Sequence, residues 1–209
     1  MLAEDVGTTI ASQRISVTYY SPDQLRSATQ TLFGLHLARD GIILLDFEGE
    51  LRRCLASLQE PDPRELLHRI NSYSGMLAIS SDEAEEHLPG LVKVARYLLR
   101  SALYAKALQA GTPRFSVTEI AATENDPSLV SLLSSHTVQQ PSVTRAYFED
   151  LRQRLSNIVG TAPDLGFDTL EALAVGTWQS NRDLSNLATL ALDDGEDALP
   201  YSEVPKVIL

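Results

Sequence analysis

Two carboxylates that lie one residue apart are the first candidates for chemistry in this chain. Asp46 and Glu48 follow directly after the apolar run from Ile42 to Leu45. At the end of a strand, such a pair could hold a metal ion for phosphoryl transfer. The same pattern is typical of a tight turn, because an aspartate followed three residues later by a glycine, here Gly49, is ordinary turn chemistry. We favour the turn, and we predict no catalytic residue, no metal ligand and no cofactor.

A cationic stripe on a long predicted helix is the second candidate. Its residues recur at three- and four-residue steps and therefore share one helix face: Lys93, Arg96, Arg100 and Tyr104. Three cations and a phenol on one face could bind a phosphate group or an acidic partner. The alternative is a polar face whose cations pair with local acids. We predict these four residues as a ligand- or partner-binding site, with local ion pairing as the alternative.

The rarer reactive side chains offer little further chemistry. The histidines are scattered, without the spacing of a zinc site: His36, His68, His87 and His136. His87 lies beside a pair of glutamates, and we expect it on the surface. Cys54 is the single cysteine, which rules out an internal disulfide and fits a reducing compartment. Its side chain is expected in the core. Trp178 is expected to anchor packing between the last helices.

The elements that must position these side chains are mostly helical. Strands are predicted at 15–20, where β-branched and aromatic residues alternate, and at 42–46. Between them, Ser21 and Pro22 predict the start of a helix that ends near Gly41. From residue 61 onward the pattern is helical, and its longest apolar periodicity lies between Leu91 and Ala105. Further helices are predicted at 127–135, 142–158, 166–178 and 181–192.

Composition and charge restrict the possible environments and partners. The chain of 209 residues is 44% apolar and 22% charged, as in ordinary globular proteins. It has no apolar stretch of about 18 residues and no apolar signal region at its N-terminus, so we predict a cytoplasmic protein without membrane contact. The net charge is −11, and residues 111–209 carry −8 of it. Nucleic-acid binding is not expected, because it requires cations that neutralise phosphates.

The segment from residue 40 to residue 51 resembles part of a known family. It follows the pattern D-G-[IV]-x-L-x-D-x-x-G-x-L, with Asp40, Gly41, Asp46 and Gly49 at the polar and glycine positions. Together with the strand and helix before it, this segment resembles the second half of small bacterial nucleotidyltransferases of the polymerase-beta-like superfamily. The sequence from 95 to 121 resembles the HEPN-like helical domain that accompanies such enzymes.

This resemblance implies an α+β fold that is mainly α. A small two-stranded sheet, the truncated remnant of a nucleotidyltransferase fold, would precede a HEPN-like helical bundle. We expect an α/β segment at 1–60, the helical bundle at 61–192 and an extended acidic arm at 193–209. The catalytic motifs are absent, since the sequence contains neither a Gly-Ser dipeptide for a triphosphate nor the Arg-x4–6-His motif of HEPN ribonucleases.

A non-catalytic interaction subunit of this ancestry is the function that the sequence favours. Such subunits are found in toxin–antitoxin and antiphage defence modules. The alternatives are a subunit that completes a split nucleotidyltransferase, or a helical domain that binds a nucleotide through the cationic stripe. A two-stranded sheet would leave an open edge and an apolar face. We therefore expect a homo-oligomer, or a heteromer with a co-encoded protein.

Overall fold

The computed structural model describes residues 9–10, 13–14, 19–133, 143–192 and 209. Within these ranges the chain is mainly helical, with eleven α-helices and one short 3-10 helix. Two strands of two residues each, β1 (Thr9–Ile10) and β2 (Gln13–Arg14), pair antiparallel and are the only strands of the described residues. The predicted dominance of helices is confirmed.

The helices before residue 60 are short. They are α1 (Pro22–Ser27), α2 (Leu32–Asp40) and α3 (Glu50–Ser57). The start of α1 is as predicted, because the Ser21 hydroxyl accepts a hydrogen bond from the Gln24 N–H. The single helix predicted up to Gly41 is instead divided. Gln30 takes a left-handed φ of 58°, and Thr31 then caps α2 by accepting from the Gly34 N–H at 2.9 Å.

The strand predicted at residues 42–46 is not formed. These residues are irregular, and the side chains of Ile42 and Leu44 are 85% and 92% exposed. The β-propensity of an aliphatic run reflects packing against neighbouring strands, and the described residues place no strand beside this one. In the other predicted strand, residues 15–18 lie outside the described residues, and Tyr19 and Tyr20 are irregular. The prediction of a sheet from these two strands is therefore wrong, because the strand at 42–46 is not formed.

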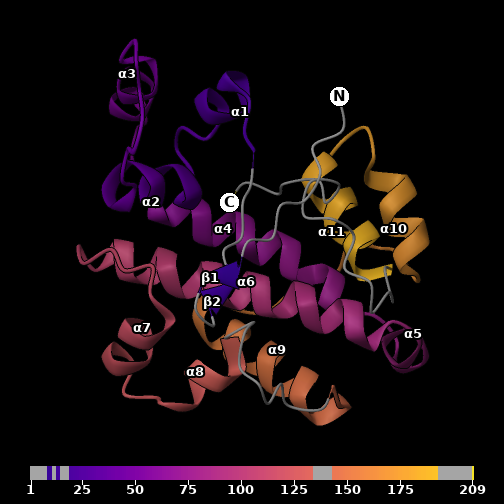
Figure 1. Cartoon of the computed structure of the whole chain (residues 1–209). Helices are drawn as coiled ribbons and strands as arrows, with labels where there is room; N and C mark the ends of the chain where they lie inside the picture. The colour runs from indigo at the N-terminus through magenta and orange to yellow at the C-terminus, as the bar shows by residue number, and fades with distance from the viewer. Residues whose placement is uncertain (1–8, 11–12, 15–18, 134–142, 193–208) are drawn as a thin grey trace.

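The long helix α6 (Leu88–Gln109) is the centre of the core. Figure 1 shows it running through the middle of the molecule. It packs against α4 (Pro63–Ser74), α9 (Arg145–Val159) and α11 (Arg182–Leu192). The apolar periodicity predicted for this helix is confirmed, since seven of its residues are 0% exposed: Leu91, Val94, Ala95, Leu98, Leu99, Ala102 and Ala105. Because α6 is buried on several sides, it positions the helices that pack against it.

Shorter elements complete the bundle. They are the 3-10 helix η1 (Gly75–Leu77) and the helices α5 (Ser81–Glu86), α7 (Val117–Thr123), α8 (Ser128–Leu133) and α10 (Leu170–Thr177). Side chains with oxygen acceptors begin several of these helices. Ser80 accepts from the Glu83 N–H at the start of α5, and Ser116 accepts from the Glu119 N–H at the start of α7.

The C-terminal pair, α10 and α11, contacts α6 very closely at one point. A Cβ atom added to Gly90, in the first turn of α6, would lie 2.0 Å from the Ala191 carbonyl oxygen in α11. The absence of a side chain at Gly90 therefore allows the two helix backbones to approach. At the junction of α10 and α11, Trp178 is 50% exposed, and the Arg182 guanidinium lies 4.4 Å from its ring centroid. The expected packing anchor is thus half in solvent.

Leu209 is the described residue of the predicted C-terminal arm, since 193–208 lie outside the described residues. Its side chain is 4% exposed and belongs to the hydrophobic core. Its carbonyl oxygen accepts a hydrogen bond from the Leu32 N–H at 2.8 Å. Residue 209 is therefore fixed at the start of α2.

Among the residues that the structure describes, none of the helices has both the length and the apolar character that a bilayer crossing requires.

Candidate functional site

In the carboxylate pair of Asp46 and Glu48, Asp46 has a structural role. The Asp46 carboxylate accepts hydrogen bonds from the Arg52 N–H at 2.9 Å and the Leu51 N–H at 3.3 Å, so it caps α3. These bonds, the Arg52 bond foremost, hold the pKa of Asp46 below its usual value. Gly49 takes a left-handed φ of 69° immediately before α3. These contacts give Asp46 a structural role at the start of α3.

The predicted cationic stripe lies on α6, but most of it is half-buried. Lys93 is exposed, whereas Arg96, Arg100 and Tyr104 are partly covered by neighbouring segments. Arg100 donates to the Leu133 carbonyl at the end of α8. Burial lowers the pKa of the Arg96 guanidinium and raises that of the Tyr104 phenol.

Hydrogen bonds tie this stripe to the protein's own backbone. The Tyr104 hydroxyl donates to the Phe115 carbonyl at 2.8 Å, which holds the segment before α7 against α6. The Arg100 contact holds the end of α8 in the same way. A phosphate bound to Arg100 would compete with this carbonyl. Binding at the stripe stays a prediction, and the contacts add a structural role to it.

A groove between α1 and α3 is a more open candidate site. It encloses about 510 Å³. Its apolar lining is Tyr20, Pro22, Leu25, Leu51 and Cys54, and its polar lining is Arg26, Asp46, Glu50, Arg53 and Ser57. Neither α1 nor α3 contains a fully buried residue. Cys54, expected in the core, is half-buried in the wall of this groove instead.

The connector between α2 and α3, residues 41–49, continues this apolar surface. Four of its large apolar side chains are 67–92% exposed: Ile42, Leu44, Leu45 and Phe47. Both ends of the connector are held in place. The Gly41 N–H donates to the Leu37 carbonyl at 3.0 Å, and Arg53 donates to the Glu48 carbonyl at 3.0 Å. The apolar side chains are therefore presented to solvent on an anchored backbone.

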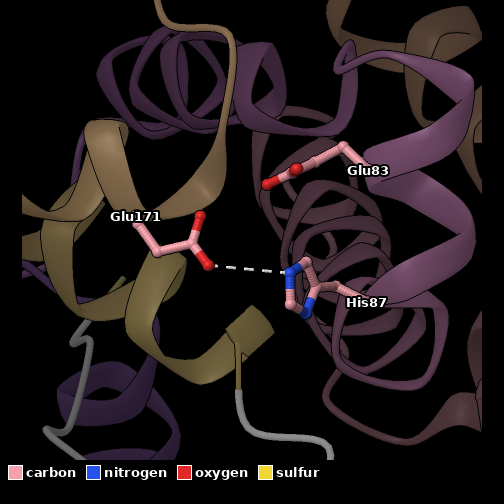
Figure 2. A group of neighbouring side chains, drawn as sticks. All are labelled: Glu83, His87 and Glu171. Atoms are coloured by element: carbon pink, nitrogen blue, oxygen red, sulfur yellow. Dashed lines mark ion pairs between the residues drawn. The ribbon is translucent and has the colours of Figure 1, made fainter.

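A cluster of possible metal ligands lies elsewhere, where α5 meets α6. Figure 2 shows Glu83 and His87 facing Glu171, which comes from α10. One ligand atom from each residue lies within 4.8 Å of the others. His87 was expected on the surface, but it is 8% exposed, and Glu171 of α10 lies 3.8 Å from its Nε2 atom. The spacing of Glu83 and His87, four residues apart, was visible in the sequence, whereas nothing in the sequence linked them to Glu171.

Comparison with known proteins gave no assignment, since no family model, no curated protein and no solved structure matches this chain. The geometry of the candidate sites is therefore the basis for a functional proposal.

Proposed function

We propose that this protein is an interaction subunit that binds a partner protein through the α1–α3 groove and the adjoining connector. The observation that carries this proposal is the exposure of Ile42, Leu44, Leu45 and Phe47 on a backbone anchored at both ends. Large exposed apolar patches on a protein surface mark binding sites for other molecules. These four large side chains are exposed and contribute little to the protein's own core.

The energy available at this surface suits a reversible complex. Burying a fully exposed aliphatic or aromatic side chain contributes roughly 1.5–3 kcal/mol, so the four connector residues together offer about 6–12 kcal/mol. Association itself costs on the order of 4–15 kcal/mol. Contacts within the groove must therefore add to the burial energy of the connector to offset the cost of association. A micromolar dissociation constant corresponds to about 8 kcal/mol of net binding free energy, so a partner must cover the groove as well as the connector to reach it.

The partner that fits best is an apolar segment of another protein with basic residues beside it. The chain carries a net charge of −11, so a second copy would bring the same charge to the interface. A basic partner is attracted by this field, and its association is accelerated. Two acids next to the exposed side chains, Glu48 and Glu50, are the residues that would meet such cations, whereas Asp40 already pairs with His36 and Arg39.

A peptide-display selection against the purified chain tests this function. We expect enrichment of apolar segments flanked by Lys or Arg. Their binding should be lost in the Leu44→Ser/Phe47→Ser double variant and retained in Val175→Ser, a control whose valine is 79% exposed on α10. Light scattering on the same samples measures self-association. Binders that ignore the double variant would refute the proposal, as would a dimer that the double variant dissociates, since the surface would then belong to a second copy.

We also propose that this interaction subunit descends from a nucleotidyltransferase with a HEPN-like helical domain. The helices packed around α6 are compatible with a HEPN-like bundle, while the irregular segment at 42–46 gives no support to a truncated sheet. A role in a defence or toxin–antitoxin module would be consistent with an interaction subunit. It is tested by whether a neighbouring gene encodes the partner that the display selection describes.

A further inference from the structure

Three side chains with metal-binding atoms converge where the starts of α6 and α10 meet (Figure 2). Glu83 lies on α5, and His87 joins α5 to α6. Glu171 is the second residue of α10 and is 84 positions beyond His87 in the sequence. Two helices that are distant in the sequence thus bring one imidazole and two carboxylates together.

The histidine is one of the two buried members of this cluster, and Glu171 is the exposed one. His87 is 8% exposed, and its Nε2 atom is directed at the Glu171 carboxylate. The distance from His87 Nε2 to Glu171 Oε1 is 3.8 Å, which is longer than a hydrogen bond. An ion about 2.0–2.2 Å from each of these two atoms is compatible with this separation, at a point off the line that joins them.

The remaining carboxylate is already oriented. Glu83 Oε1 accepts a hydrogen bond from the Leu170 N–H at 2.7 Å, at the first residue of α10. Each carboxylate has two oxygens, so Glu83 can keep this contact with one oxygen and offer the other to an ion. The hydrogen bond fixes the Glu83 side chain in the way that outer contacts fix metal ligands in proteins.

The distances require only a small adjustment. Ligand atoms bound to Zn²⁺ lie about 2.0–2.2 Å from the metal, which places them about 3.0–3.5 Å from one another. The ligand atoms of the cluster lie within 4.8 Å of one another. The Glu171 side chain is 60% exposed and free to rotate toward the other two. The exposed side of Glu171 also leaves space for water as a further ligand.

We propose that Glu83, His87 and Glu171 form a binding site for a divalent first-row transition-metal ion. A ligand set of one imidazole and two carboxylates suits Zn²⁺ and its neighbours, whereas Mg²⁺ and Ca²⁺ prefer oxygen ligands alone. The ion joins the α5–α6 junction to the start of α10. Metal binding therefore stabilises the packing of the C-terminal helices on α6.

The test is calorimetric titration of the full chain with ZnCl₂ and, separately, with MgCl₂. We expect one Zn²⁺ per chain and no measurable Mg²⁺ binding. Glu171→Gln should weaken Zn²⁺ binding by at least about tenfold, because even outer contacts of a metal site contribute about 10–100-fold. Glu171 is exposed, so this variant is expected to fold. Zn²⁺ at about 100 times its dissociation constant should raise the midpoint of thermal unfolding by roughly 5–10 °C.

Two control variants distinguish binding at this site from nonspecific binding of Zn²⁺ elsewhere on the protein. Glu85→Gln removes an exposed acid from the same helix, and it should bind Zn²⁺ like the original chain. His36→Gln removes a second His–carboxylate pair of the described residues, in which His36 Nδ1 lies 2.9 Å from Asp40, and it should also bind Zn²⁺ normally. Binding that survives Glu171→Gln, or that is lost in His36→Gln, would overturn the proposal.

Discussion

The replacement of Gly90 by alanine tests the closest helix contact of the fold. A Cβ atom at this position would lie 2.0 Å from the Ala191 carbonyl oxygen and 2.6 Å from the Ala191 carbonyl carbon. Both obstacles are backbone atoms of α11, so no side-chain rotation can relieve them. The two helices would have to separate by about 1 Å before the contact became an ordinary one.

The magnitude follows from two opposing terms. Alanine favours a helix over glycine by at most about 1 kcal/mol. Overpacking of a core costs about 1–3 kcal/mol, and a backbone obstacle places this case at the upper end. The net loss in the free energy of unfolding is therefore about 2 kcal/mol. In a chain of this length, that loss lowers the midpoint of thermal unfolding by about 4–8 °C.

Gly176→Ala is the matched control in α10. A Cβ atom there would lie 2.4 Å from Phe167 Cε1, but Phe167 is 36% exposed and its ring can rotate away. The gain in helix propensity and the cost of moving the ring are both about 1 kcal/mol, so the net change is close to zero. Urea unfolding followed by circular dichroism at 222 nm measures both variants. If Gly90→Ala proved as stable as the original chain, the close contact between α6 and α11 would be refuted.

Two further predictions concern the ends of the bundle. Leu209→Ala should lower the free energy of unfolding by about 2–3 kcal/mol because Leu209 is 4% exposed. The exposed Leu44→Ala serves as its control, and equal urea midpoints for the two variants would contradict the core position of Leu209. Asp126 accepts from Ser128 and Arg154, contacts that hold its pKa below 3.8, so its contribution to stability is present above about pH 4 and lost as the pH falls further. Asp126→Asn should therefore be less stable than the original chain at pH 7, and this difference in urea midpoint should shrink as the pH is lowered below about 4; a difference that grew toward acid would contradict this assignment.

Helices were predictable from the sequence where local signals and burial agree. The apolar residues of α6 repeat at helical spacing, and the structure buries that same face. Helix starts were also readable, because a cap such as Ser21 acts within three residues of itself. Local chemistry of this kind needs no knowledge of the rest of the fold.

The strand predicted at 42–46 was wrong, and the cluster around His87 was not predicted, for the opposite reason. The apolar run from Ile42 to Leu45 has the composition of a buried strand, but burial requires a neighbour, and the described residues supply none. His87 was expected on the surface because adjacent glutamates usually lie in solvent. In the structure its ring faces Glu171 of α10, and α10 packs on α11, which contacts α6. Both errors concern contacts between segments that are distant in the sequence.

Trp178 also determines what an optical experiment on this protein can detect. It is the only tryptophan in the chain, and it is half in solvent at the junction of α10 and α11, with Arg182 over its ring. The intrinsic fluorescence is therefore a local signal from the edge of the bundle, whereas circular dichroism averages over all helices. Comparing the two signals during unfolding shows whether the last helix pair opens with the rest of the protein or as a separate cooperative unit.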